Sequence, residues 1–369
     1  MPPDFPQDAD DVQSMTKAFH KALEEAYQRY LEGVKAVADS YDVPVGLTPK
    51  EAVWQLNKAK LYHYQPVKPA EERYPVPLLL VYALINKPYI FDLRPGRSFV
   101  EFMVSQGFDV YLLDWGIPGP EDRHTRFDDY ATEYLPRAVR KMLRVSGAGE
   151  FSILGYCIGA TLTTLYAALH PDAPIRNIVL LTAPLDFSKR EDSIFATWLD
   201  ERYFDLDRFV DSLGNIPAQV VEVGSKMLKP VENYVGAYAT LWERLEDEEA
   251  VENWQAMHRW VHDGVPFAGE AFRQWVRDYI RENQLIKGEH IVGGQRVDLS
   301  NIRAPLLNIV AEYDHIVPPS QSVSIMDLVS SQDKHLEMIS AGHVGIMAGR
   351  GARYHLWPKI AEWLGERSR

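Results

Sequence analysis

The sequence of 369 residues predicts an α/β protein in which helices flank a mostly parallel central sheet. Three observations lead to this prediction. Short apolar runs of strand length recur along the chain, segments of helical periodicity separate several of them, and one such strand runs directly into a Gly-x-Cys-x-Gly turn and then a helix. Alternation of strands and helices is typical of parallel sheets that are covered on both faces.

The predicted elements follow from apolar runs and apolar spacing. The expected strands are Leu78–Leu84, Val110–Trp115, Phe151–Tyr156, Asn177–Ala183, Leu306–Glu312 and His335–Ser340. The expected helices are residues 16–41, Ser98–Gln106, Tyr130–Val145, Ala160–His170 and Val323–Ser330. The stretch Thr48-Pro49-Lys50-Glu51 also predicts the start of a helix, with Thr48 as its N-cap.

One long interval interrupts this alternation. About 120 residues separate the strand that ends near Ala183 from the strand that begins near Leu306, far more than a simple crossover needs. We therefore expect an inserted cap at residues 185–295, a core formed by residues 46–184 and 296–369, and an N-terminal helical segment at residues 1–45. Near the end of the cap, Gly293-Gly294 predicts a two-residue hairpin turn.

Bulk properties exclude several classes of function. The formal charge of −13 argues against nucleic acid as a partner. No run of 18 apolar residues predicts a transmembrane segment, and the first residues lack the pattern of a secretory signal. A single cysteine excludes an internal disulfide, and together these features favour the cytoplasm.

The single cysteine lies in Gly155-Tyr156-Cys157-Ile158-Gly159. A strand, a Gly-x-nucleophile-x-Gly turn and a helix form the nucleophile elbow of α/β-hydrolases, here with sulfur in place of the usual serine oxygen. A Cβ atom at residue 155 or 159 would collide with the neighbouring strand or helix, which explains the two glycines. The α/β-hydrolase fold and a nucleophilic Cys157 are the resulting predictions; a buried structural cysteine is the alternative.

A cysteine nucleophile needs a base and a group that orients the base. Asp314 follows the strand Leu306–Glu312, and His343 follows the last strand in a glycine-flanked loop. The chain order Cys157, Asp314, His343 is the order of nucleophile, acid and histidine in α/β-hydrolases. His315 is a competing base, but it directly follows Asp314, and neighbours in sequence cannot easily form the acid–histidine contact. We therefore expect His315 to lie around the site without acting as the base.

The remaining parts of the predicted site are main-chain groups. The N–H of Ile158 is expected in the oxyanion hole, with a second N–H from Ile85 or Asn86 in the loop after an early strand. His258 and His262 have the spacing of metal ligands on a helix, but the zinc-protease glutamate and a third ligand are missing. We expect no metal site.

Four stretches carry a family resemblance. They are Val81–Tyr89, Tyr111–Gly116, Leu154–Gly159 and, in the cap, Gly264–Trp275. With them the chain resembles the polyhydroxyalkanoate synthases from about residue 45 onward, and its length resembles the catalytic subunits of classes III and IV, class IV most closely. The family pattern carries its Cys, Asp and His onto Cys157, Asp314 and His343.

The resemblance implies an acyltransferase that polymerises short-chain 3-hydroxyacyl-CoA, with 3-hydroxybutyryl-CoA as the expected substrate. Cys157 would carry the acyl group, His343 would act as general base, and Asp314 would orient it; coenzyme A leaves as a product, and no cofactor is expected. The implied partners are the polyester, a small second subunit, a second copy in a homodimer, and the surface of polyester granules in the cytoplasm.

Alternatives stay open at this point. A cysteine esterase or thioesterase of the same fold would release free hydroxy acid, and a granule-bound protein with an inactive site would not react at all. Because there is one cysteine, elongation requires either two facing subunits or a noncovalent intermediate beside Cys157. The helix at residues 16–41 could bind the second subunit or pack on its own core.

Overall fold

The computed structural model describes residues 9–369, with side chains described from Val12 onward. The chain forms two compact units, and each is described by itself. The larger unit consists of Val45–Leu228 and Trp260–Arg369. The smaller unit joins the chain up to Pro44 with Lys229–Arg259, so it includes part of the interval predicted as a cap.

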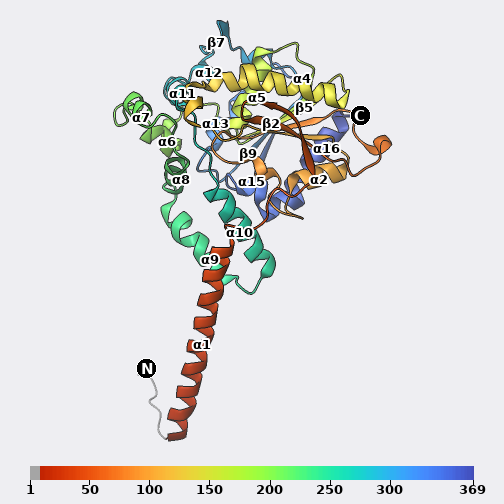
Figure 1. Ribbon diagram of the computed structural model, residues 1–369. Helices are drawn as coiled ribbons and strands as arrows, with labels where there is room; N and C mark the ends of the chain where they lie inside the picture. The colour runs from red at the N-terminus through yellow and green to blue at the C-terminus, as the bar shows by residue number, and fades with distance from the viewer. Residues whose placement is uncertain (1–8) are drawn as a thin grey trace. The chain divides into compact units, whose positions relative to one another are not determined.

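The larger unit is built on an eight-stranded sheet in the order β1-β2-β4-β3-β5-β6-β9-β10 (Figure 1). The strands are β1 (Lys50–Leu56), β2 (Ala59–Tyr64), β3 (Leu78–Val81), β4 (Val110–Asp114), β5 (Phe151–Tyr156), β6 (Ile175–Leu181), β9 (Leu306–Ala311) and β10 (Lys334–Ile339). Six neighbouring strands of the sheet, β4-β3-β5-β6-β9-β10, pair in parallel. All six predicted core strands are confirmed, and with them the α/β fold class.

The predicted helix start at Thr48 is wrong. Residues 50–56 form β1, which pairs antiparallel with β2 around a two-residue turn at Asn57 and Lys58. Asn57 has a φ of 52°, a conformation that asparagine tolerates better than most residues. The Thr48 hydroxyl donates to Asp92 Oδ1 at 2.6 Å, and its N–H donates to Asp92 Oδ2 at 3.1 Å, so neither group caps a helix.

Helices cover both faces of the sheet. Figure 1 shows α4 and α5 on one side and α2 and α16 on the other. These and the other helices of the core are α2 (Phe99–Gln106), α3 (Phe127–Asp129), α4 (Leu135–Ser146), α5 (Ile158–Leu169), α13 (Pro319–Val323), α14 (Ile325–Leu328), α15 (Gly345–Ala348) and α16 (Trp357–Arg367). The helix predicted at Val323–Ser330 is instead split between α13 and α14, and its last two residues are not helical.

The segment between β6 and β9 contains the helices expected of an insertion. In the larger unit these are α6 (Ile194–Trp198), α7 (Leu206–Leu213), α8 (Ala218–Lys226), α11 (Gly269–Gln274) and α12 (Gln284–Lys287). A hairpin of β7 (Ile291–Val292) and β8 (Gln295–Arg296) follows. Gly293 and Gly294 both have positive φ values in its turn, as the sequence predicts.

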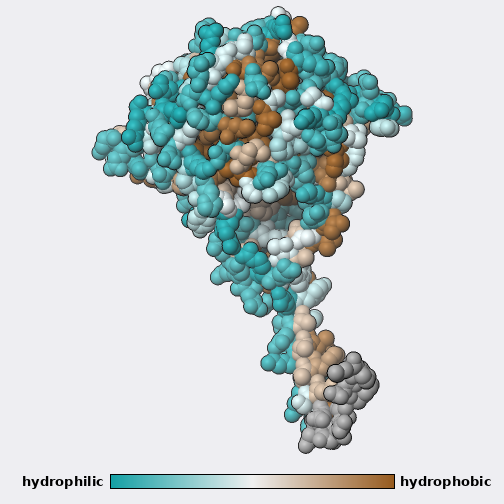
Figure 2. Space-filling view, turned by 180° about the vertical axis from the view of Figure 1, so that it is seen from behind, coloured by the Kyte–Doolittle hydropathy of each residue, from teal (hydrophilic) through white to brown (hydrophobic). Residues whose placement is uncertain are grey.

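The smaller unit contains α1 (Ala9–Asp39), α9 (Ala237–Glu243) and most of α10 (Glu248–His262). The Arg29 guanidinium donates to the Trp242 carbonyl at 2.6 Å, and the Gln255 amide donates to the Ala36 carbonyl at 2.9 Å. Further toward its N-terminus, α1 exposes a stripe of large apolar side chains, seen in tan and brown in Figure 2. No helix among residues 9–369 is long and apolar enough to cross a membrane.

Candidate active site

Cys157 lies in a strained turn between β5 and α5. Its φ of 56° and ψ of −130° are unusual for a residue with a side chain, and such strain is typical of functional turns. A Cβ at Gly155 would lie 2.5 Å from the Ala160 Cα, and one at Gly159 would lie 2.7 Å from the Tyr82 carbonyl carbon. The structure thus confirms the steric reason for both glycines. The Cys157 N–H donates to the Leu181 carbonyl at 3.0 Å, which ties the turn to β6.

Asp314 and His343 come together beyond the carboxyl ends of β9 and β10. His343 Nδ1 donates to Asp314 Oδ2 at 2.6 Å, and the Asp314 side chain is fully buried. The other carboxylate oxygen accepts the N–H groups of Ile316 at 2.9 Å and Val317 at 2.8 Å. Asp314 is therefore fixed on both sides and holds the imidazole in one tautomer, with Nε2 left for another partner.

The electrostatics of the pair favour a charged imidazole. Burial lowers the pKa of His343, but the Asp314 carboxylate and Cys157, by charge and hydrogen bonding, raise it to about 10. A cation held between a carboxylate and a sulfur is stable when the sulfur is a thiolate. His343, oriented by Asp314 and in hydrogen-bond contact with Cys157, is therefore the candidate base for this nucleophile.

The predicted oxyanion groups lie on two elements next to this turn. Ile158 is buried and is the first residue of α5, where main-chain N–H groups are not used within the helix. The loop after β3 carries Ile85 and Asn86, and Asn86 forms an isolated antiparallel bridge with Gly264 of the cap. The Ile85 carbonyl accepts the Val265 N–H at 2.9 Å, so this loop is held by the cap.

Comparison with known proteins gives two family matches. Residues 76–349 match the model of the α/β hydrolase fold, and residues 16–103 match the model of the poly-beta-hydroxybutyrate polymerase (PhaC) N-terminus. A poly(3-hydroxyalkanoate) polymerase subunit PhaC from Allochromatium vinosum is 37% identical over 342 residues, which cover 92% of this chain and 95% of that protein. This chain belongs to the PhaC family.

A second relative agrees with this membership, and a solved structure shows the same fold. The PhaC subunit from Haloferax mediterranei is 41% identical over 89% of this chain, and the matched region spans 66% of that longer protein. A thermophilic esterase from Thermogutta terrifontis has a TM-score of 0.50 at 15% identity, covering 89% of this chain and 98% of the esterase chain, and shows the shared fold alone. The predicted family, fold and enzyme class are confirmed.

The site also contains two tyrosines that were not predicted from the sequence. The Tyr156 hydroxyl donates to the main-chain carbonyl of His343 at 2.6 Å, so it holds the loop that carries the base. The Tyr82 ring lies 5.2 Å from the Tyr156 ring. Burial and nearby groups, Cys157 among them, raise the pKa of both hydroxyls well above 10, so both stay neutral. The sequence could have indicated Tyr156, because it directly precedes the nucleophile Cys157.

The other histidines considered have different surroundings. His315 is half-buried, and the Asp314 carboxylate contacts His343. His258 Nδ1 lies 2.8 Å from Ser40 Oγ, and its ring stacks on Trp254 at 4.6 Å. Among the side chains that the structure describes, from Val12 onward, no group of three or more potential metal ligands occurs.

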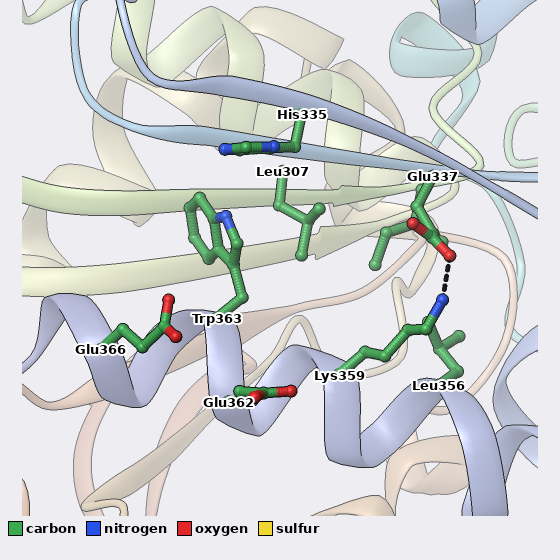
Figure 3. Close-up of a pocket in the computed structure, with 9 residues that line it drawn as sticks. Leu307, His335, Glu337, Leu356, Lys359, Glu362, Trp363 and Glu366 are labelled. Carbon is green, nitrogen blue, oxygen red and sulfur yellow. Dashed lines mark hydrogen bonds and ion pairs between the residues drawn. The ribbon is translucent and has the colours of Figure 1, made fainter.

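A surface hollow of about 210 Å³ lies elsewhere in the larger unit (Figure 3). It is lined by β9, β10 and α16, with Trp363 and His335 on its walls and an ion pair between Lys359 and Glu337 at one end. None of the predicted site residues line it. The hollow therefore contributes nothing to the chemistry of Cys157.

Proposed function

We propose that this protein polymerises short-chain (R)-3-hydroxyacyl-CoA, such as 3-hydroxybutyryl-CoA, into a polyester with release of coenzyme A. The observation that carries the proposal is the placement of Cys157 on a nucleophile elbow, in a PhaC-family chain, with His343 bound to Asp314 at 2.6 Å. No cofactor is required, because exchange of one thioester for another needs neither oxidation nor added energy.

In the first half-reaction the Cys157 thiolate attacks the thioester carbonyl. Negative charge moves to the carbonyl oxygen, where the N–H of Ile158 and one N–H from Ile85 or Asn86 stabilise it. The carbon–sulfur bond to coenzyme A then breaks, and the departing thiolate takes a proton from the His343 imidazolium. The products are an acyl thioester on Cys157, free coenzyme A and a neutral His343.

In the second half-reaction a hydroxyl attacks the acyl group on Cys157. His343 is the better candidate to remove its proton, since neutral His343 can accept one and both Asp314 oxygens already accept hydrogen bonds. An ester bond forms, and the Cys157 thiolate leaves beside the new imidazolium. The hydroxyl belongs to another monomer or to a chain end rather than to water.

The single cysteine limits how a chain can grow. One subunit has no second thiol to hold the chain while Cys157 accepts a new monomer. Growth therefore uses either two facing subunits of a homodimer or a chain that is briefly bound without a covalent link. Cys157 is only 6% exposed, which is consistent with a site that excludes the water that would hydrolyse the acyl group.

The exposed stripe of α1 is the surface that we propose for the small second subunit. Its large apolar side chains recur every three or four residues, and most are more than half exposed: Val12, Met15, Phe19, Leu23, Tyr27 and Tyr30. Such a stripe is typical of a helix that pairs with another helix. We further propose that the protein works in the cytoplasm at the surface of polyester granules.

The test is an assay of purified protein with 3-hydroxybutyryl-CoA, alone and with a co-expressed second subunit. The expected result is release of coenzyme A together with insoluble polyester, and loss of both in Cys157→Ala. Full activity of Cys157→Ala would contradict the proposal. Release of free 3-hydroxybutyrate without polymer would instead establish a thioesterase.

A further inference from the structure

The loop that carries Ile85 and Asn86 is held by one short segment of the cap, residues 260–265. The Trp260 indole N–H donates to the Lys87 carbonyl at 2.9 Å, and the Val265 N–H donates to the Ile85 carbonyl at 2.9 Å. Two carbonyls of the loop are thus bound by the same segment. These two bonds restrict the directions in which the main-chain groups of the loop can point.

Asp263 adds a second set of contacts to the same loop. Its Oδ1 lies 2.8 Å from the Lys87 ammonium, and its Oδ2 accepts the Tyr89 hydroxyl at 3.1 Å. One carboxylate therefore spans two side chains that flank Pro88. A half-exposed ion pair contributes little to stability, so these contacts matter chiefly for where the loop lies.

The geometry of the peptide group links this clamp to the chemistry. The Ile85 carbonyl and the Asn86 N–H belong to one planar trans peptide, so they point in opposite directions. Because Val265 binds the carbonyl, the Asn86 N–H is turned away from the cap segment and is held at a fixed angle. The clamp therefore orients one of the two amides that were predicted for the oxyanion hole.

We propose that Asp263 and Trp260 are positioning residues that set the second oxyanion donor of the Cys157 site through the loop at residues 85–89. This inference rests on the proposed function, since it assigns the donor to acyl transfer. It also means that the cap must be in place for efficient acylation. Displacement of residues 260–265 would weaken the oxyanion hole without touching Cys157, Asp314 or His343.

The test compares two reactions of the same sulfur. Acylation by 3-hydroxybutyryl-CoA passes through an oxyanion, whereas alkylation of Cys157 by iodoacetamide does not. Both can be followed without ambiguity because Cys157 is the only thiol. Asp263→Asn keeps the size of the side chain and removes its charge, while Trp260→Phe keeps an aromatic ring and removes the N–H donor.

We expect the acylation rate to fall about tenfold in each variant. Complete loss of an oxyanion donor lowers the rate by about 10²- to 10³-fold, and a donor that is only misplaced should lower it by less than that. The change should be in kcat with KM within about twofold, and the alkylation rate should stay within about twofold. Asp207→Asn is the matched control: it removes another cap ion pair, with Arg273, that does not contact the loop. It should leave both rates unchanged.

Two results would overturn the inference. Unchanged acylation in both variants would show that the clamp does not position the donor. An equal fall in acylation and alkylation would show that the substitutions disturb Cys157 and His343 themselves. Failure of the proposed function would look different from both results, because the unaltered protein itself would then show no acylation by 3-hydroxybutyryl-CoA.

Discussion

The contact between Asp314 and His343 can be tested most fully by Asp314→Asn, which keeps the shape of the side chain and removes its charge. Burial lowers the pKa of His343, and the charge of Asp314 is the largest of the influences that raise it instead, from 6.5 to about 10. That rise corresponds to about 5 kcal/mol in favour of the imidazolium. Without the carboxylate, burial dominates, and the pKa of His343 falls.

Loss of this stabilisation affects both half-reactions. The Cys157 thiolate loses its cationic partner, and the imidazole is no longer held in the tautomer that leaves Nε2 for Cys157. Orienting aspartates in catalytic triads contribute roughly 10³- to 10⁴-fold to the rate. We expect the rate of coenzyme A release to fall by this order, and the rate of iodoacetamide alkylation near neutral pH to fall as well.

The assay measures coenzyme A release and Cys157 alkylation across a range of pH values. The control is Glu337→Gln. It removes the ion pair between Glu337 of β10 and Lys359 of α16, and it should change neither rate by more than about twofold. A variant Asp314→Asn that kept coenzyme A release within threefold of the unaltered protein would refute the assigned role. An unchanged pH dependence of alkylation would refute the electrostatic argument.

Three further predictions concern stability. The pKa of His343 in the folded protein lies above its unfolded value of 6.5, so His343 should stabilise the fold relative to His343→Gln fully below pH 6.5, and this stabilisation should disappear as the pH rises through about 10. Urea unfolding of both proteins at several pH values measures the difference in their free energies of unfolding. A difference that widened as the pH rose would contradict the prediction. Gly159→Ala should lower the free energy of unfolding by about 1–3 kcal/mol through collision with the Val81 and Tyr82 main chain, and an unchanged urea midpoint would count against that collision. Tyr156→Phe should cost about 1–3 kcal/mol, because the buried His343 carbonyl loses its donor, and equal stability of the two proteins would exclude such a bond.

Much of the core was predictable because local patterns agree with the fold. The predicted strand Phe151–Tyr156 matches β5 at both ends, and the glycines around Cys157 mark the turn that follows. Asp314 and His343 were found because parallel strands end at the same edge of a sheet, which brings residues 29 positions apart into contact. The positions of these residues after predicted strands, together with the chain order nucleophile, acid, histidine, were the basis for naming the pair.

Other features depend on contacts that a sequence does not display. The Thr48-Pro49-Lys50-Glu51 stretch has the composition of a helix start, but pairing with β2 and the bond from Thr48 to Asp92 outweigh that local preference. Tertiary pairing often overrides such signals. The clamp of Asp263 on Lys87 joins segments 176 residues apart, and no periodicity in either segment indicates it.

The central claim is that Cys157 carries the growing polyester. The most direct measurement is mass spectrometry of the Cys157 peptide after rapid acid quenching during turnover of 3-hydroxybutyryl-CoA. We expect a series of adducts on Cys157 that differ by one 3-hydroxybutyryl unit and are absent from Cys157→Ala. A single monomeric adduct, with free 3-hydroxybutyrate as the sole product, would contradict it.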